Sequence, residues 1–382
     1  MPVQGRILVS GAGVAGLTAA LGLARAGYQV TVVERAPSIR AGGFLVSLSH
    51  TAYQTANQLG LIEPLQAFNL GITRSSYHDA SGRQLLGLDY ARLMADLDII
   101  QVMRDDLVQV LFDQVRQLAE VRFGDHITTV NTTSPCAAVT LASGTELQAD
   151  LAIIAEGQNS PTRGQVFGED ATSLDYLDLC CAAVRVPNVA AITGKFETHM
   201  ERNRYMACFN TRGTDLGAVF VWSSPAREKQ PRDLRATVLR AAFDNTSDPL
   251  TRALLETLPD PENIYMDTLF QVTLPTWTRG MFVAIGDAAN CLTLFSGRGA
   301  AAAVTSAHLL TRAICDAGLH NGIHQFEADN RKRIHQIQAA TRRAVKLYVP
   351  GTWFRQQLRD NAMRWLPERV FQHYFQRKYR AI

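Results

Sequence analysis

The sequence predicts an α/β protein with a sheet-rich middle part and a helical C-terminal part. Residues 7–34 run from an apolar strand through a glycine-rich turn and a helix into a second apolar strand, the order of a parallel βαβ unit. Residues 172–275 contain alternating segments such as RYMACFNT and LGAVFVWSS, which are typical of strands. Residues 322–349 have the pattern of a long basic helix.

Composition excludes several classes of protein. The chain has 382 residues, of which 47% are hydrophobic and 19% charged, and its formal net charge is +3. These values are typical of a globular protein with two sizeable cores and give no reason to expect a nucleic-acid partner. The six cysteines have neither zinc-ligand spacing nor a disulfide-framework pattern, so we expect reduced thiols and a cytoplasmic location. No apolar run approaches the ~18 residues of a membrane span, so we expect no integral membrane segment.

The stretch 7–34 has the features of a dinucleotide-binding unit. Its G-x-G-x-x-G turn follows a strand and opens a helix, and the second strand ends at Glu34. Gly11 permits the tight turn, and Gly13 lets a pyrophosphate approach the backbone amides at the positive end of the helix. Glu34 can accept hydrogen bonds from ribose hydroxyls and disfavours a 2′-phosphate, which leaves FAD or NAD. The predicted contact set is Gly11, Gly13, Val14, Ala15, Gly16 and Glu34.

A second glycine-rich turn, GDAANCLTLFSGRG, occupies residues 286–299 and leads into an alanine-rich helix. Asp287 follows a strand and can hydrogen-bond a polyol such as the ribityl chain of FAD. The helix start would direct amides and positive dipole toward the flavin pyrimidine, where negative charge collects on reduction. Arg104, at a strand-to-helix junction, can clamp a phosphate or ribose. FAD, unlike NAD, is long enough to need both turns, so FAD is the predicted cofactor.

These motifs resemble those of the FAD-dependent monooxygenases of the aromatic-hydroxylase type, which include para-hydroxybenzoate hydroxylase and the tetracycline-inactivating monooxygenases. The matching segments are GAGVAG with Glu34-Arg35, Arg104, DLAIIAEGQNSPTR (150–163) and GDAANCLTLFSGRG, in the family's order. The resemblance implies an α/β fold in which a Rossmann-like FAD-binding domain is interrupted by a β-sheet-rich substrate domain and followed by a helical C-terminus. The implied boundaries are 1–72, 101–171 and 276–345 for the FAD-binding domain, 73–100 and 172–275 for the substrate domain, and 346–382 for a C-terminal helical cap.

The resemblance also implies an activity and further cofactor contacts. The expected reaction is hydroxylation or epoxidation of an aromatic or polyketide-like small molecule with O₂, in natural-product biosynthesis or degradation. NAD(P)H would bind as a transient co-substrate, since the chain holds a single dinucleotide fingerprint. Further FAD contacts are assigned by position to Arg35, Arg104 and Asp287, and to Gly297, Arg298, Gly299 and Ala300 in the second turn.

The sequence departs from the family pattern at several positions. Glu156 replaces an aspartate, Asn290 replaces a histidine, and Thr293 and Leu294 stand where the family carries proline. Arg298 adds a positive charge beside the expected flavin pyrimidine. These departures leave FAD binding intact but keep two other functions open: a cyclase that uses the flavoprotein fold without net redox chemistry, and a protein that sequesters a ligand.

The catalytic residues stay open at this point, because the cofactor carries out the oxygen transfer while the protein positions the substrate and excludes water. Two candidates are Arg298 and His199, the latter as a general base near neutral pH. The predicted substrate pocket consists of the aromatic residues Tyr205, Phe209, Phe220 and Trp222.

Overall fold

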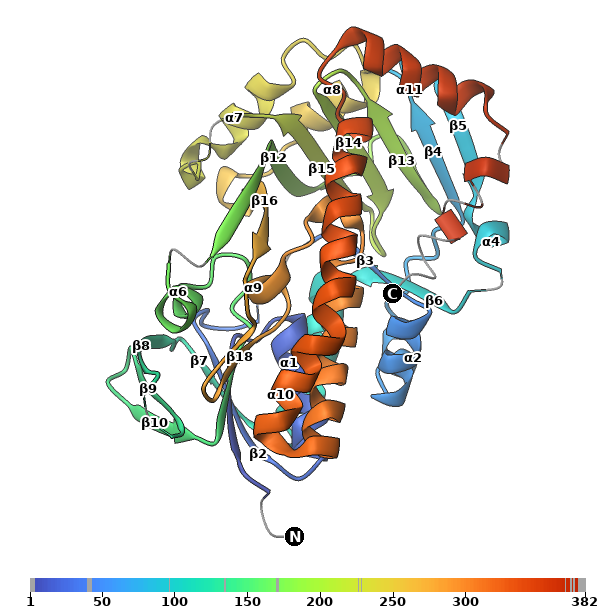
Figure 1. The fold of residues 1–382 in the computed structure, drawn as a ribbon. Helices are drawn as coiled ribbons and strands as arrows, with labels where there is room; N and C mark the ends of the chain where they lie inside the picture. Colours follow the sequence, from blue (N-terminus) through green and yellow to red (C-terminus); the bar gives the residue numbers. More distant parts are fainter. Residues whose placement is uncertain are drawn as a thin grey trace.

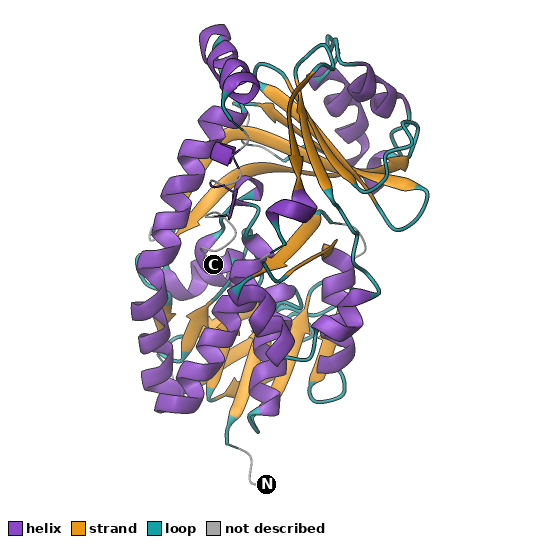
Figure 2. Ribbon diagram, turned by 90° about the vertical axis from the view of Figure 1, so that its right-hand side faces the viewer, coloured by secondary structure: helices purple, strands orange, loops and turns teal. Residues whose placement is uncertain are grey.

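The structure is a computed structural model that describes residues 4–39, 43–95, 97–133, 135–169, 172–225, 227, 229–367, 369–371, 373 and 375–376. Two large sheets form separate layers, one above the other, and a long helix runs alongside both of them (Figures 1 and 2). The mixed α/β class that the sequence predicts is confirmed.

The first layer is a six-stranded sheet with the order β17-β18-β11-β1-β2-β7. All neighbouring strands run parallel except β17, which pairs antiparallel with β18 at one edge. The central strands are buried on both faces, which explains why they read as unbroken apolar runs. The strands are β1 (Arg6–Ser10), β2 (Gln29–Glu34), β7 (Glu120–Phe123), β11 (Leu151–Ile154), β17 (Thr278–Arg279) and β18 (Phe282–Ala284).

Helices and two small sheets surround this layer. Helix α1 (Val14–Arg25) packs against α5 (Arg104–Val115) and α10 (Gly299–Tyr348). The small sheets consist of β8 (Ile127–Asn131), β9 (Ala137–Leu141) and β10 (Glu146–Ala149), and of β3 (Leu45–Ser49) with β6 (Ile99–Met103). Shorter helices are α2 (Thr51–Gln58), α3 (Ile62–Gln66), α4 (Tyr90–Leu93), α6 (Pro161–Phe167) and α9 (Asp287–Asn290).

The second layer is a seven-stranded sheet with the order β16-β12-β15-β14-β13-β4-β5. Its pairings are antiparallel except for β13 with β4. One face is covered by α7 (Arg235–Ala242) and α8 (Pro249–Glu256), and the other packs against Phe295, Tyr348 and Met363. The strands are β4 (Arg74–His78), β5 (Gln84–Asp89), β12 (Ser173–Pro187), β13 (Lys195–Met200), β14 (Arg204–Asn210), β15 (Asp215–Ser223) and β16 (Tyr265–Thr273).

Helix α10 changes direction once, at Gly318, whose φ of 79° lies in the left-handed region. A Cβ at Gly322 would stand 2.5 Å from the carbonyl oxygen of Ala313, so the two arms meet closely at this turn. The second arm climbs from the first layer to the second, and α11 (Trp353–Trp365) then lies beside β5 (Figure 1).

The strand membership of the two sheets bears on the predicted domains. All strands of the seven-stranded sheet fall within 73–100 and 172–275, and all strands of the six-stranded sheet fall outside those ranges. The three-part boundaries remain a proposal, which this distribution supports. Among the described residues, no helix is both long enough and apolar enough to cross a membrane.

Candidate cofactor site

The first glycine turn has no room for side chains on its inner side. Gly11 has φ 109°, and a Cβ there would stand 2.4 Å from the carbonyl oxygen of Ala155. A Cβ at Gly16 would stand 2.0 Å from the carbonyl oxygen of Gly11, so both glycines allow α1 to lie against β1 and β11. Gly13 differs, because among the described residues its Cβ would meet only the Arg104 guanidinium, at 3.9 Å. Space beside Gly13 is what a pyrophosphate needs to reach the amides that open α1.

Glu34 holds this turn in shape. Its carboxylate accepts hydrogen bonds from the amides of Ala12, at 2.9 Å, and Ala36, at 2.8 Å. Each carboxylate oxygen has two lone pairs, so the group retains capacity for ribose hydroxyls. Arg35 is exposed next to it, where it can reach a ligand only from the solvent side.

The second glycine turn contacts the first directly. Gly286 ends the strand segment before α9 with φ 59°, and a Cβ there would stand 2.7 Å from the Cβ of Ala15. The two segments that the sequence separates by about 270 residues therefore meet at the start of α1. This contact places Asp287 on the same side of the sheet as Gly13.

Arg104 lies between the two turns. The backbone amide of Arg104 donates to the carbonyl oxygen of Phe44 at 3.0 Å. A Cβ added at Gly43 would stand 2.9 Å from the Cβ of Arg104. Its positive charge acts on the carboxyl of Asp287 and on the hydroxyl of Tyr265. A guanidinium with these neighbours can neutralise a phosphate that lies on the Gly13 amides.

Asp287 combines two properties that together define a cleft. Its side chain is accessible to solvent, yet desolvation by the surrounding protein raises the pKa of its carboxyl, against the opposing effect of Arg104. A residue that is both accessible and surrounded lines a concave space. Tyr265 behaves alike: it is 46% exposed, while desolvation raises its pKa well above the ordinary value.

Sequence reasoning missed Tyr265. Its ring meets that of Phe44 edge-on, with 5.5 Å between the ring centres, so it lies where the second layer faces the first. In the sequence it is one of several aromatic residues in alternating strands, and nothing local marks it. Only the pairing of β16 with β12 shows that it points toward the cleft.

The loop after Asp287 ends at the start of α10. Gly297 has φ 62°, and Arg298 is the residue that precedes the first turn of the helix. A Cβ at Gly299 would meet none of the described atoms within 4 Å, so there is space beside the start of the helix. The loop therefore presents a helix N-terminus, with its positive dipole, on the same cleft as Asp287.

Glu156, the departure from the expected aspartate, has a structural role. Its carboxylate accepts from the hydroxyls of Ser10 at 2.5 Å and Ser160 at 2.6 Å, and from the amide and hydroxyl of Thr162. It thus ties the end of β1 to the start of α6. Arg163 continues the link, because its guanidinium donates to the carbonyl oxygens of Gln158 and Ala288.

The four predicted pocket residues lie on two opposite faces of the seven-stranded sheet. Tyr205 and Phe209 lie on the sheet face that meets Phe295 and Tyr348. Phe220 and Trp222 lie on the opposite face, where both rings pack edge-on against Phe243. Cross-strand partners share a face, and Phe220 pairs with Met206 rather than with Tyr205 or Ala207. Phe220 and Trp222 are therefore core residues and not pocket residues.

The candidate base His199 is also on the far face. It pairs with Met206 across β13 and β14, and its Nδ1 lies 2.8 Å from a carboxylate oxygen of Asp248 at the start of α8. The seven-stranded sheet separates it from the cleft, so it cannot touch a substrate there. This prediction was wrong, because alternation alone does not say which face of a strand meets the cofactor.

A separate hollow of about 870 Å³ lies between β17 and the second arm of α10. Glu327 lines it and accepts hydrogen bonds from Thr276 and Thr278, both at 2.9 Å. None of its lining residues belongs to the cleft between the two turns. We assign it no part in cofactor binding.

The fold and the cleft define an FAD-binding α/β protein. The parts fit the cofactor because the ADP end would lie along Gly13 and Glu34, while the flavin end would lie at Asp287 and the start of α10. Comparison with known proteins confirms this class: the chain belongs to the FAD binding domain family, which matches residues 5–341.

Relatives and solved structures agree with this family. A flavin-dependent monooxygenase of Legionella longbeachae is 27% identical over 80% of this chain and 79% of its own. The FAD-dependent monooxygenase asL6 of Sarocladium schorii is 26% identical over 82% and 80% of the two chains.

The structural matches cover almost the whole chain. Klebsiella pneumoniae HpxO, complexed with FAD and uric acid, superposes with a TM-score of 0.87 at 20% identity and covers 98% of this chain and 97% of its own. Tetracycline destructase Tet(55) gives a TM-score of 0.83 at 23% identity and covers 100% and 98%. The predicted family, its FAD cofactor and the enzyme class, a flavin-dependent monooxygenase, are confirmed.

Proposed function

We propose that this protein hydroxylates or epoxidises an aromatic or polyketide-like small molecule with NAD(P)H and O₂. The observation that carries this proposal is an aromatic wall, formed by the largely buried rings of Phe295 and Tyr205 together with the Tyr348 ring, next to the second glycine turn. Phe295, from the second glycine turn, lies 5.9 Å from the Tyr205 ring and 6.3 Å from the Tyr348 ring. Three elements that are distant in sequence thus place aromatic rings together beside the start of α10.

The wall suits a flat, largely apolar substrate. Tyr205 comes from β14, Phe295 from the glycine turn and Tyr348 from the end of α10. Aromatic side chains can bind an aromatic substrate through ring–ring contacts and through burial of its apolar surface. The Tet(55) neighbour is a tetracycline destructase by name, and a tetracycline is a polyketide of this shape. We therefore expect fused or single phenolic rings rather than sugars or amino acids.

In this proposal FAD, when bound, supplies the redox and oxygen chemistry. Glu34, Arg35, the amides after Gly13, and Arg104 hold the ADP part. Asp287 would hold the ribityl chain, and the amides from Gly297 to Ala300 would lie toward the pyrimidine. The Arg298 side chain precedes α10 and adds positive charge at that end, so we propose it as the residue that stabilises negative charge there. The cytoplasmic location of the protein, which the cysteine pattern suggests, also stays a prediction.

The test uses the FAD-loaded protein and a panel of tetracyclines and polycyclic phenols. Substrate-stimulated NAD(P)H oxidation, together with one ¹⁸O atom from ¹⁸O₂ in the product, would support the proposal. Turnover under anaerobic conditions without reductant, with no change of mass, would instead establish a cyclase. Tight binding with no product under any condition would establish a sequestering protein.

Thr293 and Leu294 stand where the family pattern has proline, in the loop beside the proposed flavin end. This difference is the reason to test for a cyclase as well. The Tyr205→Leu variant tests whether the substrate lies against the aromatic wall. It removes one ring of the wall and leaves the FAD contacts untouched, so a change in substrate KM without a change in FAD content locates the substrate.

A further inference from the structure

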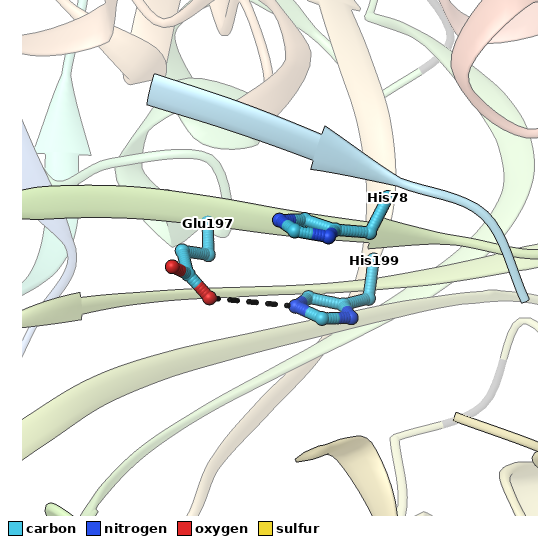
Figure 3. A group of neighbouring side chains, drawn as sticks. All are labelled: His78, Glu197 and His199. Atoms are coloured by element: carbon cyan, nitrogen blue, oxygen red, sulfur yellow. Dashed lines mark ion pairs between the residues drawn. The ribbon is translucent and has the colours of Figure 1, made fainter. Parts of the chain in front are cut away.

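Three polar side chains gather on the far face of the seven-stranded sheet, away from the flavin cleft. His78 comes from β4, and Glu197 and His199 come from β13, which runs parallel to β4 with His199 opposite His78. The two imidazole rings are stacked, with 4.5 Å between their centres and 5° between their planes. Figure 3 shows the two rings one above the other, with the Glu197 carboxylate beside the His199 nitrogen to which the dashed line leads.

The outer nitrogens of both rings are fixed by other groups. His199 Nδ1 lies 2.8 Å from Asp248 Oδ1, and His78 Nδ1 lies 3.2 Å from the carbonyl oxygen of Gly82. In the neutral ring, each contact makes Nδ1 the protonated nitrogen, so that Nε2 carries the lone pair. A carboxylate or backbone carbonyl on the far nitrogen is the usual support of a metal-binding histidine.

The inner nitrogens lack hydrogen-bond partners. Within the described part of the chain, His78 Nε2 and His199 Nε2 are buried polar atoms that make no hydrogen bond. The His199 side chain is only 6% exposed, so its Nε2 has no access to bulk water. A buried ring nitrogen without a hydrogen bond is costly, and the Glu197 carboxylate, 3.7 Å from His199 Nε2, is too far away to supply one.

We propose that His78, Glu197 and His199 bind one divalent transition-metal ion of the zinc type. One ligand atom from each of the three lies within 4.8 Å of those from the other two. Ligands at the zinc–nitrogen distance of about 2.0–2.1 Å lie roughly 3.3 Å apart in a tetrahedron. Side-chain rotation of about an ångström closes that gap, and water would complete the coordination. Two imidazoles and a carboxylate are a set that zinc accepts.

The local charge favours a cation. Glu197 Oε2 lies 3.7 Å from His199 Nε2, and the Asp248 carboxylate lies on the other side of that ring. Burial would lower the pKa of His199, but these two carboxylates raise it to about 9. Burial and the nearby His199 charge lower the pKa of His78, so His78 is the neutral ligand. The metal would replace the proton on His199, and Lys195 is the nearby cation that acts on Glu197.

Such an ion would have a structural effect. Asp248 caps α8 by accepting from the amide of Thr251 at 2.7 Å, and Ser247 donates to the carbonyl oxygen of Ala80 in the β4–β5 turn at 2.6 Å. The ion would therefore join the β4–β5 hairpin at the sheet edge to β13 and, through Asp248, to α8. The sheet separates it from the flavin, so it takes no part in the oxidation.

The test begins with FAD-loaded protein that has been treated with a chelator and then titrated with Zn²⁺ or Co²⁺. We expect one equivalent of tightly bound metal, a Co²⁺ absorption spectrum of low-symmetry coordination, and a rise in Tm when Zn²⁺ is added. Because imidazole and carboxylate ligands bind a metal ion in their deprotonated forms, the apparent affinity should fall at acid pH.

Two variants keep the result independent of folding. Glu197→Gln and His78→Gln preserve size and should each weaken binding by about tenfold or more. The control is the exposed pair His320 and His324 on α10, four residues apart with 5.0 Å between ring centres, which can also collect metal ions. The double variant His320→Ala/His324→Ala should keep the tight equivalent.

Two results would overturn the proposal. One is the absence of any stoichiometric binding at micromolar Zn²⁺ in the wild-type protein. The other is binding that survives in Glu197→Gln and His78→Gln but disappears in the α10 double variant. Neither readout depends on flavin turnover, so the outcome does not depend on the proposed reaction.

Discussion

Replacing Gly13 with alanine separates cofactor binding from folding. Gly13 precedes α1 with φ −84° and ψ −175°, an extended conformation that alanine also adopts. The nearest atom to the new Cβ would be Arg104 Nη2 at 3.9 Å, so the protein itself has room for the methyl group. Alanine is a poorer helix cap than glycine, but it also lowers the entropy of the unfolded chain. These effects are each up to about 1 kcal/mol and oppose one another.

The Gly13→Ala variant should, in contrast, bind the FAD pyrophosphate less tightly. The methyl group would occupy the space beside the amides that open α1, and a lost hydrogen bond to a charged phosphate costs about 1.5–3 kcal/mol. That corresponds to a roughly 10- to 150-fold weaker FAD affinity. We expect Gly13→Ala to have a Tm within about 2 °C of wild type without FAD, at a cost well under 1 kcal/mol. Circular dichroism gives the Tm, and quenching of flavin fluorescence gives the Kd.

Two further variants calibrate this measurement. Gly213→Ala adds a methyl group that meets nothing within 4 Å and should change neither quantity. Gly11→Ala places a Cβ 2.4 Å from a backbone oxygen at φ 109° and should impair folding itself. If Gly13→Ala bound FAD as tightly as Gly213→Ala, the pyrophosphate would not lie on the first glycine turn and the cofactor geometry argued above would fail.

Three other predictions concern the cleft and the far face. Arg104→Gln should weaken FAD binding, because it removes a charge–phosphate contact, and the loss should be smaller at high salt. An unchanged Kd at low salt would exclude a contact between Arg104 and the FAD phosphate. Phe220→Leu should lower stability by about 1 kcal/mol and leave substrate KM unchanged, whereas Tyr205→Leu should raise KM; steady-state kinetics that reverse this order would contradict the face assignment. The raised pKa of His199 should stabilise the metal-free fold, and this stabilisation should be complete below about pH 6.5. The contribution, at most about 3.4 kcal/mol, should disappear as the pH rises through about 9. Urea denaturation at pH 6 and pH 9.5 measures that loss, and Asp248→Asn should reduce it; a stability that increases over this range would refute the assignment.

The sequence was sufficient to predict the FAD cofactor because each proposed cofactor residue lies at a junction that local rules recognise. Gly11, Gly13 and Glu34 are fixed by a strand, a turn and a strand end, and Asp287 follows another strand. The carboxyl ends of neighbouring parallel strands meet at one edge of a sheet, so strand-end residues converge even when they are distant in sequence. The contact between Gly286 and Ala15 is the consequence.

The substrate side could not be predicted in the same way. Alternation in residues 204–223 shows that two faces exist, but it does not show which face meets the flavin. That depends on how β14 and β15 pair, since one step of register exchanges the faces. Phe220 and Trp222 were misplaced for this reason, as was His199. Tyr265 was missed because its strand, β16, reaches the cleft only through its pairing with β12.

The loop at the flavin end shows how the fold compensates for a missing proline. A proline ring would fix the backbone there, and Thr293 and Leu294 cannot do so. Ser296 supplies hydrogen bonds instead: its hydroxyl donates to the carbonyl oxygen of Thr293 at 2.9 Å and accepts from the amide of Arg298 at 3.0 Å. Ser296 is only 4% exposed, so these bonds are protected from water. The turn is thereby held from Thr293 to the first residue before α10, and the helix start keeps its position relative to Asp287. A loop fixed by hydrogen bonds can still present its amides to a bound flavin, so the Thr293 and Leu294 substitutions are compatible with the proposed cofactor site.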